Sequence, residues 1–92
     1  MRTIYKYELE IVDSQTLMLP VAFEVLTVEA QQGKLCLWAL VDPEETELSP
    51  LSVMIKGTGH KITDDEWADF YYLKSVHMPP FVWHVFLCVE TI

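Results

Sequence analysis

Apolar and polar residues alternate along the first third of the chain, and this period of two predicts β-strands. The alternation covers residues 3–11 and returns over Glu24–Gln31. A shorter strand is predicted at Thr16–Leu19, and Pro20 ends it because proline lacks the N–H that a sheet ladder needs. The residues predicted to face the interior are Thr3, Tyr5, Tyr7, Leu9, Ile11, Leu26, Val28 and Ala30.

Two segments, Leu35–Val41 and Phe81–Val89, are apolar on both faces of a strand. Such strands are typical of the middle of a sheet or of a position between two layers, where both faces are covered. Other strands are predicted over residues 51–55 and 71–78. Gln31–Lys34 is predicted to be a tight hairpin in which Gly33 takes the positive φ that such turns need.

One segment has the pattern of a helix start. Thr63 is followed three residues later by Glu66, which is the spacing of a capping box, and Ile62 and Trp67 occupy the positions of a hydrophobic staple. No helical periodicity continues beyond about Tyr71, so the helix is predicted to have one or two turns. The chain is therefore predicted to be a single β domain of residues 1–92. Its expected fold is mainly β, an antiparallel sandwich or small barrel of about seven strands with one short helix.

The charge of the chain is strongly acidic, with 14 acidic and 6 basic residues and a formal net charge of −8. This balance argues against direct binding to a nucleic-acid backbone, which needs clustered lysine and arginine. It permits an acidic surface to meet a basic patch on a protein partner. The acidity has a second explanation, which is that a high net charge keeps a small, apolar protein soluble.

The apolar runs indicate where the protein resides. None approaches the roughly 20 residues of a membrane helix, and the N-terminus has no apolar signal core. We therefore expect a cytoplasmic protein with no membrane contact. In that reducing compartment, Cys36 and Cys88 are predicted to be buried thiols and not a disulfide. Because so short a chain is only marginally stable alone, a homo-oligomer is also expected.

The residue types that commonly bind metals or act in catalysis are present, but their spacing along the chain does not fit either role. His60, His77, His84, Cys36 and Cys88 do not show the spacing of structural zinc sites. Along one strand, His84 and Cys88 would lie about 13 Å apart, which is too far for a Cys–His pair. The sequence therefore predicts no metal site, no cofactor and no enzyme.

The segment Gly57-Thr58-Gly59-His60 has the composition of a ligand-binding loop. Its glycines can expose backbone N–H groups as a nest for an anion, and lysines flank it on both sides. A plain connection between a strand and a helix explains the same residues. On the first interpretation, the ligand-binding residues are Lys56, Gly57, Thr58, Gly59, His60, Lys61 and His84.

Four spaced motifs resemble a family of small phage and prophage proteins of unknown function. They are Lys6-Tyr7-Glu8-Leu9, residues 37–42 (LWALVD), Gly57-Thr58-Gly59-His60 and residues 82–86 (VWHVF), and the likeness extends over essentially the whole chain. The turn at Met78–Phe81 departs from it by being shorter. The resemblance implies an accessory protein that acts in the cytosol of a bacterial host, where small viral proteins often inhibit or divert host factors, including defence systems.

Two functional hypotheses follow. The first is a non-enzymatic protein that binds and inhibits or modulates a host protein. The second is a protein that sequesters a nucleotide or another phosphate-bearing ligand through residues 56–61. For the first hypothesis, the predicted contact residues are the acids of an exposed loop and three aromatic residues: Glu44, Glu45, Glu47, Tyr72, Trp83 and Phe86.

Overall fold

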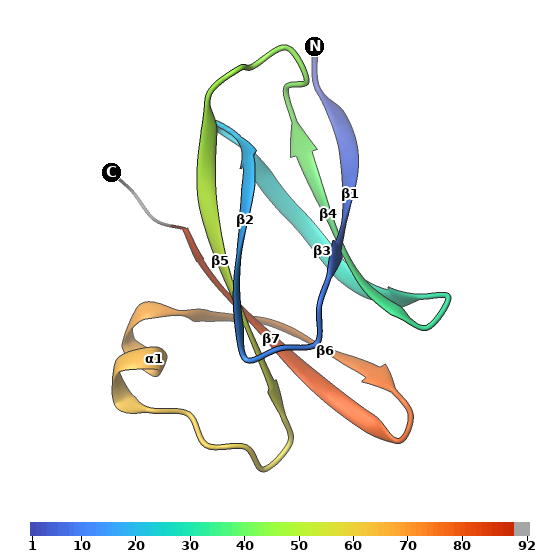
Figure 1. The fold of residues 1–92 in the computed structure, drawn as a ribbon, viewed down its shortest axis with the longest axis vertical. Helices are drawn as coiled ribbons and strands as arrows, with labels where there is room; N and C mark the ends of the chain where they lie inside the picture. Colours follow the sequence, from blue (N-terminus) through green and yellow to red (C-terminus); the bar gives the residue numbers. More distant parts are fainter. Residues whose placement is uncertain (90–92) are drawn as a thin grey trace.

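The computed structural model describes residues 1–89, and residues 90–92 of the predicted domain 1–92 lie outside the described part. Residues 1–89 form two antiparallel sheets and one short helix (Figure 1). The strand orders are β1-β4-β3 and β2-β5-β7-β6. The elements are β1 (Thr3–Leu9), β2 (Ser14–Pro20), β3 (Glu24–Gln31), β4 (Lys34–Val41), β5 (Leu48–Gly57), α1 (Asp64–Asp69), β6 (Tyr71–Met78) and β7 (Phe81–Val89). The predicted fold class is confirmed.

The inner faces of the two sheets share one hydrophobic core. β4 is the middle strand of its sheet, and β7 lies between β5 and β6 in the other, so the predicted central positions of both doubly apolar segments are confirmed. An ion pair between Lys74 of β6 and Glu29 of β3 joins the two sheets at one side. The buried core residues are Leu9, Leu19, Val28, Leu35, Leu37, Ala39, Val41, Leu51, Val53, Ile55, Val76, Val85 and Leu87.

Two hairpins fix the pairing of neighbouring strands. At the β3–β4 turn, Gln32 and Gly33 have φ values of 52° and 77°, as a type I′ turn requires, so the predicted turn and its glycine are confirmed. The β6–β7 turn contains a cis peptide bond between Pro79 and Pro80.

The predicted inward face of β3 was partly wrong. The register against β4 shifts between Val25 and Thr27, so Leu26 occupies a bulge and is 43% exposed, whereas Val25 packs against the core. A bulge adds one residue to a strand and so reverses the alternation on one side of it. Ile11 was also misassigned, because β1 ends at Leu9 and Ile11 lies exposed in the connection to β2.

The connection from β5 to β6 carries α1, which packs on the outer face of β7, the strand that separates β5 from β6 in the sheet. Its helix begins with the predicted capping box: the Thr63 hydroxyl accepts the Glu66 amide N–H at 3.1 Å, and the Thr63 amide N–H donates to Glu66 Oε1 at 2.9 Å. Trp67 of α1 packs edge-to-face on Phe86 of β7, with ring centroids 6.4 Å apart. The covering connection explains why β7 is apolar on both faces. Within residues 1–89 no helix has the length and apolarity to cross a membrane.

Candidate functional site

The loop after β5 forms a tight turn over residues 57–60. The amide N–H of His60 donates to the carbonyl oxygen of Gly57 at 3.0 Å, and Gly59 has a φ of +90°, a conformation that favours glycine. The His60 ring folds back over the turn, where its Nδ1 accepts the amide N–H of Gly57 at 3.0 Å. The amide donors of Gly57 and His60, which an anion nest would use, are therefore engaged within the turn itself.

Lys56, predicted to supply positive charge to this loop, is already paired. Its side chain is buried, and Nζ lies 2.7 Å from Asp13 Oδ1 and 3.1 Å from Glu66 Oε2. The hydrogen bond to Asp13 is the main cause that raises the pKa of Lys56, and the bond to Glu66 acts in the same direction. The other predicted cation, Lys61, is exposed. Two carboxylates thus balance the one buried ammonium group at the base of the loop.

Glu66 should give the folding stability a specific acid dependence. The bond from the Thr63 amide N–H, and next the contact with Lys56, lower the pKa of Glu66. A carboxylate with a lowered folded-state pKa stabilises the fold above its ordinary pKa and loses this contribution as pH falls through the lowered value. We expect wild type to melt at a higher temperature than Glu66→Gln above about pH 4.5, and the difference to shrink in more acidic solution. Melting curves from pH 2 to 7 measure this, and a difference that stays constant with pH would contradict it.

His84 of β7 links the loop to β6. Its Nε2 lies 2.8 Å from Thr58 Oγ1, and its Nδ1 lies 2.9 Å from the Tyr72 hydroxyl oxygen. A neutral imidazole has one donor and one acceptor nitrogen, and a hydroxyl group can serve either, so all three side chains are satisfied. The sequence offered no local sign of this contact, because it depends on the pairing of β6 with β7 and on the course of the loop.

A hollow of about 370 Å³ lies between the loop, α1 and the outer face of β7. We call it the aromatic hollow. It brings together all of the predicted ligand-binding residues except Lys61, and it adds the two staple residues of the helix. It also contains two of the predicted partner-contact residues, Tyr72 and Phe86. The lining residues are Lys56, Gly57, Thr58, Gly59, His60, Ile62, Trp67, Tyr72, His84 and Phe86.

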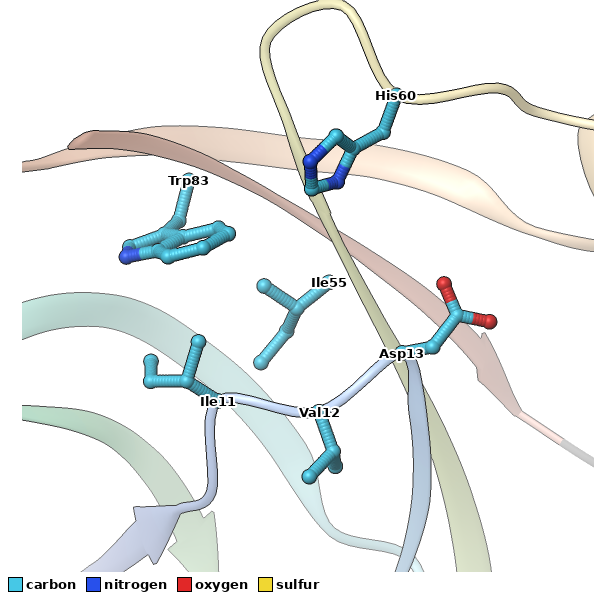
Figure 2. Close-up of a pocket in the computed structure, with 6 residues that line it drawn as sticks. All are labelled: Ile11, Val12, Asp13, Ile55, His60 and Trp83. Atoms are coloured by element: carbon cyan, nitrogen blue, oxygen red, sulfur yellow. The ribbon is translucent and has the colours of Figure 1, made fainter.

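On the other side of His60 lies a second concave surface, which we call the end groove. It consists of two adjoining cavities, of about 200 and 520 Å³, that share Ile11 and Trp83. Figure 2 shows the smaller cavity, with Trp83 and His60 above and the β1–β2 connection below. Its lining is Ile11, Val12, Asp13, Ile55, His60 and Trp83, and the larger cavity adds Ala30, Gly33, His77, Met78, Pro79 and Phe81.

The rim of the end groove is markedly apolar. Phe81 is 56% exposed and stacks on half-buried Trp83, with centroids 5.2 Å apart and an interplanar angle of 30°. Ile11 and Val12 are exposed to 42% and 40%. Of these residues only Trp83 was predicted to contact a partner. Ile11 and Val12 are exposed because they lie in the short β1–β2 connection, and Phe81 is exposed because it lies at the end of the β6–β7 hairpin. The sequence pattern does not reveal this exposure.

The predicted partner-contact residues do not form one surface. The loop between β4 and β5, which carries the three glutamates, lies at the opposite end of the molecule from the turn at residues 57–60 (Figure 1). Glu45 accepts the amide N–H of Glu47, so its carboxylate also shapes its own loop, while Glu44 and Glu47 are exposed. Phe86 is only 2% exposed and forms the floor of the aromatic hollow, so it is not a protruding anchor.

Potential metal ligands are dispersed in the described structure. Among residues 1–89 no group of three or more histidine, cysteine, aspartate or glutamate side chains is placed to hold a metal ion. Cys36 is buried on the outer face of the three-stranded sheet, and Cys88 is half-buried on the outer face of the other sheet. Both are free thiols, and the hydrophobic core separates them.

Comparison with known proteins gives a family and no function. A family model described as a domain of unknown function, DUF7352, matches residues 1–91. No curated protein and no solved structure matches the chain.

Proposed function

The chain belongs to the DUF7352 family, whose function is unknown, and we propose that it is a non-enzymatic binding protein that inhibits or modulates a protein partner. The finer form of the proposal is an accessory protein that acts in the cytosol of a bacterial host on a host protein, including proteins of defence systems. The resemblance to phage and prophage proteins is the source of this finer form.

The observation that carries the proposal is the end groove. Large apolar side chains that stay exposed around a cavity commonly mark a protein-interaction surface. Phe81 and Trp83 supply the rigid aromatic area that dominates binding energy at many interfaces. The partner that fits is a protein segment with an apolar anchor and basic flanks, because the chain carries a net charge of −8 and would attract such a segment.

The histidine environments support a binding role over a catalytic one. Both ring nitrogens of His84 are hydrogen-bonded to hydroxyl groups, and Nδ1 of His60 accepts the Gly57 amide. A histidine that activates a nucleophile is normally oriented by a third group, often a carboxylate, on its other nitrogen. Neither of these contacts pairs the imidazole with a carboxylate.

The alternative, sequestration of a nucleotide, has one observation in its favour. Nearly all of the residues predicted for it line the aromatic hollow. The charges oppose it, however, because Lys56 is neutralised and Asp64, Asp65 and Glu66 lie in the first turn of α1. We therefore place protein binding first.

The end groove can be tested by reversing its apolar character. We expect Phe81→Glu to reduce capture of the protein partner at least tenfold, since a carboxylate would have to be desolvated against the partner's anchor. The measurement is affinity capture from a bacterial lysate followed by titration of the identified partner. Ile4→Glu is the matched control, because Ile4 is also 56% exposed but lies on the outer face of the other sheet. Equal loss of binding in both variants would refute the groove as the contact surface.

A further inference from the structure

We propose that the aromatic hollow receives the ammonium group of a lysine side chain from a protein partner. The inference rests on the proposed function, in that the lysine belongs to the basic flank of the segment bound in the end groove. His60 lines both surfaces, so a chain lying in the groove passes directly beside the hollow.

Three aromatic rings give the hollow its shape. Phe86 forms a buried floor, and Trp67 and Tyr72 stand at steep angles to it, 73° and 89°, with centroids 6.4 and 5.2 Å from its own. Trp67 and Tyr72 remain 64% and 46% exposed, so the hollow opens to the surface. Aromatic faces attract a cation within about 6 Å of their centroids, and several rings around one cavity are a known receptor for ammonium groups.

The Tyr72 ring is held in place before any ligand arrives. Its hydroxyl group bonds to His84, which in turn bonds to Thr58, and its ring lies 5.2 Å from that of Phe86. The backbone of Trp67 is fixed by the capping box and by the bond from its amide N–H to the Thr63 carbonyl oxygen at 3.0 Å, and its ring rests against Phe86. Preorganised walls favour binding because less side-chain freedom is lost when the ligand enters.

The surrounding charge selects a cation. Asp64, Asp65 and Asp69 are exposed on the helix that carries Trp67. The one ammonium group within the hollow, that of Lys56, is balanced by Asp13 and Glu66. An incoming phosphate would meet this negative field and a turn whose Gly57 and His60 amides are engaged, whereas an incoming ammonium group is attracted by both the rings and the acids.

The angles between the rings favour lysine over arginine. A planar guanidinium group stacks flat against a single aromatic face. Near-perpendicular walls suit a compact group that contacts several faces at once, which is the geometry of an ammonium group and of its methylated forms.

The test uses small probes and the purified protein. N-acetyl-lysine methylamide, its Nε-trimethyl form and the neutral norleucine analogue are titrated while the indole N–H signals are followed by NMR. We expect both cations to shift the signal of Trp67 saturably, with those of Trp38 and Trp83 changing little, and norleucine to bind at least fivefold more weakly. Equal binding of norleucine would overturn the proposal, and so would a Trp67 shift with inorganic phosphate or adenosine monophosphate in place of the cations.

Adjacent tyrosines supply a matched pair of variants. Tyr72→Ala should weaken binding of the trimethyl-lysine probe about 3- to 30-fold, the range expected for loss of one cation–π contact. Tyr71→Ala should leave it unchanged, because Tyr71 is similarly exposed, at 51%, but does not line the hollow. Tyr72→Phe should keep most of the affinity, since the ring remains. Equal effects of the two alanine variants would overturn the proposal.

The two proposals can fail separately. The probe titration involves no partner, so a negative result removes the lysine site and leaves the end groove standing. If the probes bind as expected while Phe81→Glu has no effect on capture, the groove is refuted and the hollow is retained as a cation site.

Discussion

Replacing Leu37 by alanine should destabilise the protein by about 2–5 kcal/mol, which is the usual cost of truncating a fully buried leucine. Leu37 is 0% exposed and lies at the middle of β4, opposite Tyr7 of β1 and Val28 of β3. The cost combines lost burial with an unfilled cavity, since the flanking strands hold their positions. Because small domains are stable by only about 5–15 kcal/mol, urea denaturation should detect the change readily.

Leu26→Ala is the matched control for this experiment. Leu26 lies in the neighbouring strand and belongs to the alternating pattern of β3, but the bulge leaves it 43% exposed. We expect a loss within about 0.5 kcal/mol, as for most surface substitutions. If Leu26→Ala costs as much as Leu37→Ala, Leu26 faces the core in solution, as simple alternation predicts.

Removing Asp13 should expose the cost of a buried charge. We expect Asp13→Ala to destabilise the protein by about 1–3 kcal/mol, because the Lys56 ammonium group stays buried and loses its 2.7 Å partner. The backbone of this segment should hold, since the Asp13 carbonyl still accepts the Ile55 amide N–H at 3.1 Å. Chemical denaturation of the single variant measures the loss.

Repeating Asp13→Ala in a Lys56→Met variant isolates the interaction between Asp13 and Lys56. Lys56→Met keeps a long apolar stem without the charge, and buried ion pairs replaced by apolar residues are often nearly neutral in stability. In that background Asp13→Ala should cost less than about 0.5 kcal/mol, because no buried ammonium group remains. A cost for Asp13→Ala that is the same in both backgrounds would show that Asp13 acts through its own loop and not through Lys56.

Local sequence determined the elements of this protein closely. The boundaries of β3, β6 and β7 follow from alternation, apolar runs and the diproline, because side chains on a pleated strand must match the environment on each face. The capping box at Thr63 and the glycine at residue 33 were also predictable, because both are local features that span at most four residues. The capping box bonds free amide N–H groups at the helix start, and Gly33 adopts the positive φ of the turn. The charge of the chain was equally available from composition.

Only the tertiary structure shows which strands are neighbours in each sheet and in which register they pair. The two doubly apolar segments indicated central strands, but not which neighbours would flank them. The bulge at Leu26 depends on how β3 pairs with β4, and a register shift leaves no mark in the alternation itself.

The candidate site was decided almost wholly by tertiary contacts. The sequence left Gly57–His60 open to two interpretations, an anion nest or a plain connection. Folding places the carboxylates of Asp13 and Glu66 on Lys56 and closes the turn with the His60 ring, which favours the connection. The aromatic hollow exists only because β7 lies between β5 and β6 and α1 packs on its outer face, which brings Trp67 over Phe86. The sequence by itself therefore determined the strands, the helix start and the acidity. The strand order decided which side chains meet, because pairing between distant segments is set by the shared core and not by any local pattern.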